Sequence, residues 1–205
     1  MYTTVTYGLL YILFATFTFV FGGVYAFSPS KAGLSFLGSG VGTIVGLLFV
    51  GIFGDGTLWG VIASGKATRP GDRLVLFITV PSALSIPAGL FIYGWSTDKH
   101  VHWIVPEIGT VVMGFGMISL VMCIQTCLAD AFTIHAASTA AADAVPRSLL
   151  GALLPLCGLD MYNSLGLGWG NSLLAFIALG LAPVPWLFRF YGERIRTNPK
   201  WQVTF

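Results

Sequence analysis

Charged side chains are scarce in this sequence. Lys and Arg contribute 10 residues and Asp and Glu contribute 8, so that 9% of the 205 residues are charged while 56% are hydrophobic. A soluble globular domain carries about 25% charged residues, and the composition therefore excludes one. The formal net charge of +2 is also too small to indicate a protein that binds nucleic acid.

Signals for cofactors are missing as well. The sequence contains no Gly-x-x-x-x-Gly-Lys-Ser/Thr motif, which argues against direct use of ATP. The 3 cysteines all lie inside apolar stretches, where we expect them to pack as small side chains. His100 and His102 lie in a polar connection, and two imidazoles are too few to complete a metal site. We therefore expect neither a cofactor nor a metal.

Long apolar runs fill the rest of the sequence. Each run has roughly 20 residues, which is enough to cross a hydrocarbon core of about 30 Å as a helix. The sequence therefore predicts an all-α integral membrane protein of six transmembrane helices, with a basic tail over 189–205. The predicted spans are 6–27, 32–54, 74–95, 103–129, 133–159 and 169–188.

Lys and Arg are divided unevenly between the connections. The side that holds both predicted termini carries Lys66, Arg69 and Arg73 in one loop and the basic cluster of the tail. The opposite side has Lys31 and Lys99. Because positive charge accumulates in cytoplasmic connections, both termini are predicted to be cytoplasmic.

Glycine repeats along one face of the second predicted span, at Gly38, Gly42 and Gly46. Small residues at this spacing let helix backbones approach closely in lipid. The repeat predicts a packing ridge against a neighbouring helix.

Five segments of the sequence carry distinctive motifs, and the order of these motifs along the chain is informative. They are YAFSPSKAGLSFLGSGVG (25–42), GKATRPGDRL (65–74), HWIVPEIGTVVMGFG (102–116), AASTAAADAVPRSLLGALLPL (136–156) and the run at 161–196. In this order they resemble the second half of the major facilitator superfamily, specifically the twelve-helix drug:proton antiporters of fungi. The resemblance covers nearly the whole chain.

The resemblance implies a half-bundle equivalent to helices seven to twelve. It further implies proton-coupled efflux of small organic compounds, such as drugs, toxins or secondary metabolites, by alternating access in the plasma or vacuolar membrane. The implied partners are the lipid bilayer, the substrate, protons, and a second six-helix half or a second copy of the chain. The family's conformational loop corresponds here to Asp55, Arg69 and Arg73, although Gly56 stands where the family usually has a basic residue.

Two acids depart from the family pattern and lie inside predicted spans. Asp143 stands where a neutral polar residue is usual, and it can pair with Arg147 one turn later; Thr139 extends the same face. This set is a polar wall of the transport path or a charge pair that switches between inward and outward states; the alternative is a fixed ion pair facing the partner bundle. Each buried charge costs about 2.5–3.5 kcal/mol to insert, which argues for a role.

Glu107 stands where an apolar residue is usual. It lies five helical turns before Gln125, so that both are predicted on one face of the fourth span, with Gly114 and Ile118 between them. If this face lines the cavity, Glu107 is a candidate proton-exchanging carboxylate. The alternative is a solvated residue of an outer vestibule.

Aromatic residues crowd the first span. Phe14 and Phe17 are candidates for stacking against flat or cationic compounds in the transport path. The alternative is that they fill space against lipid.

The functional alternatives to a transporter module are three. The chain can be a truncated half-transporter without activity of its own, or a structural subunit that needs a second half. More remotely, it can be a small integral-membrane cyclase in which Glu107 and Asp143 serve as the acids. Apart from that remote case, no enzyme is expected.

Overall fold

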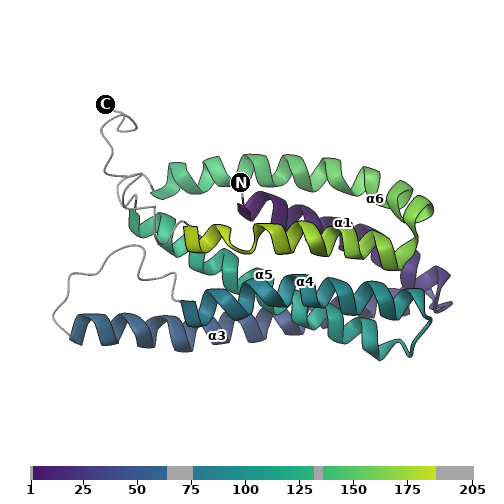
Figure 1. Ribbon diagram of the computed structural model, residues 1–205, viewed down its shortest axis with the longest axis horizontal. Helices are drawn as coiled ribbons and strands as arrows, with labels where there is room; N and C mark the ends of the chain where they lie inside the picture. The colour runs from purple at the N-terminus through teal and green to yellow at the C-terminus, as the bar shows by residue number, and fades with distance from the viewer. Residues whose placement is uncertain (1, 64–75, 132–135, 188–205) are drawn as a thin grey trace.

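Helices form the whole of the secondary structure in the computed structural model, which describes residues 2–63, 76–131 and 136–187. Figure 1 shows the elements along the bundle. They are α1 (Tyr2–Gly23), α2 (Pro29–Leu34), α3 (Phe36–Ala63), α4 (Leu76–Asp98), α5 (Ile104–Ala131) and α6 (Ala136–Leu181).

Five of these helices are long and apolar enough to cross a membrane, and a kink divides the last of them into two arms. Gly166 breaks α6 with φ 76° and ψ 169°, a backbone conformation that is essentially confined to glycine. The two arms of α6 run in opposite directions from this point (Figure 1). The described chain thus has six crossings, and the all-α membrane fold predicted from composition is confirmed.

The helix boundaries differ from the predicted spans in particular places. α1 begins and ends a few residues earlier than the span 6–27, and α3 continues to Ala63, beyond the predicted end at 54. A short helix, α2, lies in the first connection; Ser28 precedes it and a proline stands in its first turn, where a missing backbone N–H costs nothing.

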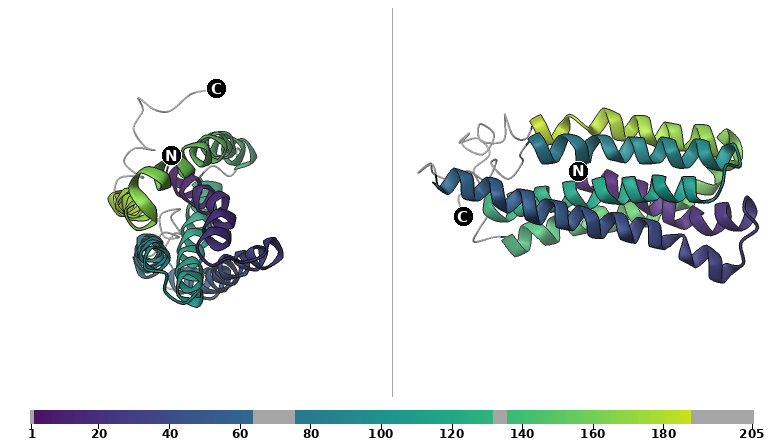
Figure 2. Two further views of the ribbon diagram at one scale, coloured as in Figure 1. Left: turned by 90° about the vertical axis from the view of Figure 1, so that its right-hand side faces the viewer. Right: turned by 90° about the horizontal axis from the view of Figure 1, so that it is seen from below.

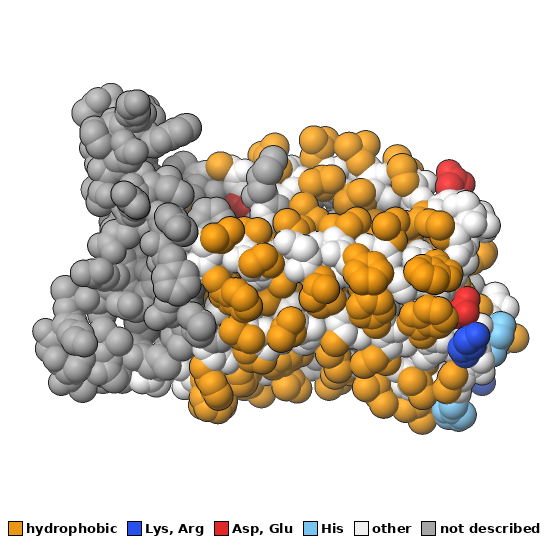
Figure 3. Space-filling model, in the orientation of Figure 1, with side chains coloured by type: hydrophobic (Ala, Val, Ile, Leu, Met, Phe, Trp, Pro, Cys, Tyr) orange, Lys and Arg blue, Asp and Glu red, His pale blue; other side chains and the backbone are white. Residues whose placement is uncertain are grey.

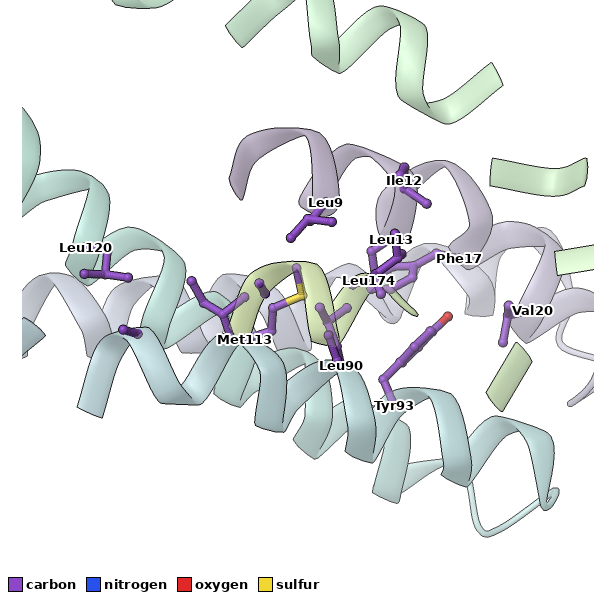
Figure 4. Close-up of a cluster of buried hydrophobic side chains, with 14 of the residues drawn as sticks. Leu9, Ile12, Leu13, Phe17, Val20, Leu90, Tyr93, Met113, Leu120 and Leu174 are labelled. Atoms are coloured by element: carbon purple, nitrogen blue, oxygen red, sulfur yellow. The ribbon is translucent and has the colours of Figure 1, made fainter. Parts of the chain in front are cut away.

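The helices pack in a consistent order. α5 lies between α3 and α4, α4 packs against α6, and α1 packs against α6. Figure 2 shows the bundle end-on and from below. Side chains from α1, α4, α5 and α6 meet in the centre, as Figure 4 shows for Leu13, Phe17, Leu90, Tyr93, Met113 and Leu174.

The glycine ridge of α3 faces α5. A Cβ atom at Gly38 would meet the Glu107 carboxylate and the Thr110 hydroxyl, one at Gly42 would meet the Val111 carbonyl oxygen, and one at Gly46 would meet Ile118. The predicted packing ridge is therefore found, and its partner is α5. Backbones this close gain van der Waals contact that bulkier side chains would prevent.

The outer surface is apolar along the bundle and charged at one end. Figure 3 shows hydrophobic side chains over the visible flank, with acidic, basic and histidine side chains at the end that holds the α4–α5 connection. α3 is the most exposed of these crossings: 17% of its most apolar 18-residue stretch is buried, compared with 56% for the corresponding stretch of α4. A surface of this kind is suited to lipid or to another protein in the membrane, not to water.

Substitution of Gly42 by Val is expected to destabilise the bundle, because the new side chain would collide with the backbone of Val111. Overpacking of this kind costs about 1–3 kcal/mol. Gly40→Val is the matched control, since nothing lies within 4 Å of a Cβ atom there and the gain in helix propensity is the same. Thermal unfolding in detergent should show a lower Tm for Gly42→Val alone; equal Tm values for the two variants would contradict the α3–α5 contact.

Candidate functional site

The first arm of α6 lies parallel to α1 and in register with it. Three pairs mark the register: Thr3 with Asp143, Tyr7 with Arg147, and Tyr11 with Gly151. Both members of the pairs advance by four residues, which is one helical turn. The polar pairs are the first two, so that one end of this interface carries charge and the rest is apolar.

Asp143 joins three helices. Its Oδ1 accepts a hydrogen bond of 2.5 Å from the Thr3 hydroxyl of α1, and its Oδ2 accepts one of 2.8 Å from Nε2 of Gln125 in α5. The carboxylate is half-buried. Since an ionised carboxylate only accepts hydrogen bonds, the side-chain amide of Gln125 presents its nitrogen to it.

Arg147 has a different partner from the one expected. Its guanidinium lies over the ring of Tyr7, 4.5 Å from the ring centroid, a cation–π contact. No ion pair joins Asp143 and Arg147 in the described part of the chain. The i, i+4 spacing of the two residues suggested that they pair with each other. In the structure, α1 instead supplies a different partner to each, Thr3 to Asp143 and Tyr7 to Arg147.

Glu107 occupies the first turn of α5, against α3. Its carboxylate lies beside Gly38, and the Thr110 hydroxyl contacts both the Glu107 carbonyl (2.8 Å) and Oε2 (3.4 Å). A negative charge here is stabilised by the positive end of the helix dipole. This accounts for the acid structurally.

The face predicted to run from Glu107 to Gln125 does not line a cavity over its length. Gly114 packs on the backbone of Ser39, and Ile118 lies beside Gly46, so that this part of the face is the contact with α3. Gln125, in contrast, reaches Asp143 of α6. About 27 Å of helix separates Glu107 from Gln125 at 1.5 Å per residue, and the two acids, Glu107 and Asp143, therefore lie toward opposite ends of the bundle.

The aromatic candidates of α1 lie inside the half-bundle. Phe17 is fully buried and contacts the rings of Phe14, Phe36 and Tyr93 at centroid distances of 5.6, 5.1 and 5.7 Å. Phe14 is partly buried and also meets Phe36. Phe17 is thus a core residue in this arrangement, neither filler against lipid nor an exposed stacking surface.

The connection after α1 is tied to the connection between α4 and α5. The Tyr25 hydroxyl donates to the Val101 carbonyl over 2.8 Å, and Phe27 packs edge-on against Trp103. Burial raises the pKa of Tyr25 above its ordinary value, so the hydroxyl keeps its proton and remains a donor. This contact closes the end of the bundle opposite Asp143.

The remaining candidates contribute less to the site. Thr139 is half-buried on α6, one turn before Asp143. Arg69 and Arg73 lie outside the described residues, and of Asp55 the structure describes the backbone, which is part of α3.

Several known proteins with similar sequences are named as MFS or MFS-type transporters. The chain is 52% identical over 205 residues to the MFS-type transporter penM of Penicillium rubens, covering 100% of this chain and 40% of that protein. It is 51% identical over 200 residues to the MFS-type transporter atr4 of Stereocaulon alpinum (98% of this chain, 36% of that protein) and 50% identical over 206 residues to the MFS transporter cpaT of Aspergillus oryzae (100% and 41%). MFS abbreviates major facilitator superfamily.

The chain belongs to the major facilitator superfamily. It spans about two fifths of the length of these curated relatives, and its six crossings are consistent with the carboxy-terminal half of the superfamily fold. It is an integral membrane protein. No family model matches the sequence, and no solved structure matches it.

Sequence reasoning missed two residues of this superfamily member's polar network, Thr3 and Tyr7. A signal was present, because Thr3 and Tyr7 are four residues apart, as are Asp143 and Arg147. Matching spacings on two helices indicate a shared register only when the helices are known to be parallel neighbours. Only the structure shows that α1 and the first arm of α6 are parallel neighbours.

The hydrogen bond between Gln125 and Asp143 predicts a specific coupling between substitutions. Gln125→Leu should lower the Tm, because it removes one donor from a half-buried carboxylate; hydrogen bonds between membrane helices contribute about 0.6 to 2 kcal/mol. Adding Asp143→Leu to Gln125→Leu should cost less than the sum of the two single changes, since the unsatisfied acid is then gone.

A double-mutant cycle of thermal unfolding in detergent measures this coupling. Strictly additive Tm changes would show that the two side chains do not interact.

Proposed function

We propose that this chain is the carboxy-terminal half of a secondary transporter that exports small organic compounds from fungal cells, driven by proton entry. The observation that carries the proposal is the match of essentially the whole chain, at about 50% identity, to MFS-type transporters of fungi. Proton coupling and the direction of transport follow from the resemblance to drug:proton antiporters.

The surface of the half-bundle supports a second half as partner. α3 and the first arm of α6 expose large apolar side chains along their lengths, among them Leu48, Ile52, Val145 and Leu156. In transporters built from repeats, the substrate site lies between two bundles that rock about it. The Thr3–Asp143–Gln125 network would then form part of one wall, and the other wall would come from a preceding six-helix half or from a second copy of this chain.

The charge distribution supports an orientation. Lys31 and Lys99 are exposed near the connection that Tyr25 closes, whereas the other basic residues of the connections precede α4 or follow α6 in sequence. We propose that the end with Lys31 and Lys99 faces outward and that both termini are cytoplasmic. The host membrane would be the plasma or the vacuolar membrane.

The main alternative is a half-transporter that moves nothing by itself. It is favoured by the share of the relatives that the chain covers, 36% to 41%. The cyclase alternative has no such support, because Glu107 and Asp143 lie too far apart to act on one substrate.

A chimera tests the proposal. The chain replaces its matched segment in penM of Penicillium rubens, and inside-out vesicles are assayed for uptake of the fluorescent organic cation rhodamine 6G driven by a pH gradient. We expect uptake by the chimera and by penM and none by the 205-residue chain alone, because one half supplies one wall.

Size-exclusion chromatography serves as the folding control. A folded chimera that is inert while penM transports would overturn the proposal. Uptake by the chain alone would replace the two-half arrangement with a homodimer.

A further inference from the structure

Asp143 links separate membrane crossings through both of its carboxylate oxygens. It lies two turns inside α6, and its two hydrogen bonds reach α1 and α5. Glu107, in the first turn of α5, is bonded to Thr110 on its own helix, and its carboxylate packs beside Gly38 of α3. A change of charge at Asp143 therefore acts on three helices at once, whereas one at Glu107 acts on α5 and the neighbouring start of α3.

Within the residues that the structure describes, no cation forms an ion pair with Asp143. On α6 the charged neighbour is Arg147, which lies over Tyr7. On α1 the titratable neighbour is Tyr7 itself, one turn after Thr3. On α5 the residues one turn before and after Gln125 on its face, Val121 and Ala129, are neutral. The two hydrogen bonds that Asp143 accepts therefore come from neutral donors, Thr3 and Gln125.

We propose that Asp143 takes up and releases the coupling proton of the transporter. This inference rests on the proposed function. A proton from water on one side of the membrane forms an O–H bond with a carboxylate oxygen, which takes the side chain from charge −1 to neutral; on the other side the bond breaks and the proton returns to water. No other bond changes.

The hydrogen-bond partners point to Oδ1 as the oxygen that is protonated. Thr3 both donates and accepts, so its hydroxyl needs only to rotate to accept a bond from a protonated Oδ1. The amide nitrogen of Gln125 is a donor only, and protonation of Oδ2 would require the whole amide to turn over. Thr3 is therefore a partner for both protonation states.

Protonation changes how α1 is held against α6. With Asp143 charged, the Thr3–Asp143 bond is charge-assisted and Arg147 is attracted from one turn away. With Asp143 neutral, that attraction vanishes and Arg147 stays with Tyr7. One proton therefore changes the interactions of both polar pairs, Thr3 with Asp143 and Tyr7 with Arg147. The packing of α1 against α6 changes with them.

Infrared difference spectroscopy of the 205-residue chain in liposomes tests proton uptake without any substrate. Between about pH 4 and about pH 8, a range that spans ordinary carboxyl titration, the wild type should show a carboxylic-acid band that Asp143→Asn loses. Asp160→Asn, an exposed acid on the same helix, should keep the band. Thr3→Ser should leave the band in place and Thr3→Val should shift it. Loss of the band in Glu107→Gln instead of Asp143→Asn would overturn the assignment.

Transport by the chimera is the second test of the proton role. Asp143→Asn should abolish accumulation of rhodamine 6G against its gradient and leave exchange of the probe across the membrane intact, because exchange needs no net proton movement. Asp143→Glu, which keeps a titratable group, should restore accumulation; it also guards against a folding defect in the amide variant.

Three outcomes separate the inferences. Accumulation by Asp143→Asn at the wild-type level overturns the proton role. Loss of exchange as well, with a neutral probe still carried, shows that Asp143 recognises cationic substrate instead and also overturns it. A wild-type chimera that moves no probe while the Asp143 band is present overturns the proposed function but not the proton binding.

Discussion

In a hydrocarbon environment every polar group needs a partner inside the protein, and this constraint shapes the chain at each level. The backbone meets it by forming helices, since a helix satisfies its own N–H and C=O groups. Hydroxyl side chains meet it locally: Thr16, Ser82 and Thr97 each donate to a carbonyl three or four residues earlier. Apolar burial then contributes little to association, because lipid is as apolar as leucine. The helices are held by close contact instead, and the glycines of α3 make that contact with α5 possible.

The same constraint makes the few polar groups that bridge helices informative. Most hydroxyls in the described crossings bond to their own helix and so say nothing about neighbours. Asp143 cannot do so, because a carboxylate needs donors and the donors of a helix interior are already used. It draws Thr3 and Gln125 from two other helices, and the parallel register of α1 with α6 places Tyr7 under Arg147 as a consequence. One acid thereby fixes which faces of three helices meet.

Much of the fold was predictable because the relevant signals are local. The apolar runs predicted the crossings, and the spacing of Gly38, Gly42 and Gly46 predicted a contact ridge.

The site was less predictable because its partners are remote in sequence. The spacing of Asp143 and Arg147 favoured an ion pair, but a cation–π contact and a hydrogen bond to α1 compete with that pair, and both depend on the neighbouring helix. The periodicity of α5 placed Glu107 and Gln125 on one face, yet that face meets α3 at Gly114 and Ile118 and α6 at Gln125. Phe17 fell in the core for the same reason: its helical position is visible in the sequence, but the helices that cover it are not.

The distribution of polarity over the half-bundle has a direction. At one end Tyr25 binds the connection between α4 and α5, and Glu107 lies against α3 in the first turn of α5. These contacts join segments that are far apart in sequence. Toward the other end, Asp143 joins three crossings through side chains alone. Of the described residues, Asp143 is an ionisable group on which the contact between three crossings depends at this end, so a change in its charge would alter their packing. The exposed apolar side chains of α3 and of the first arm of α6, such as Leu48 and Val145, are uncharged and lie outside this network. The polar interior and the apolar flanks therefore differ in kind: the flanks present a surface suited to lipid or another bundle, and the Asp143 network joins α1, α5 and α6.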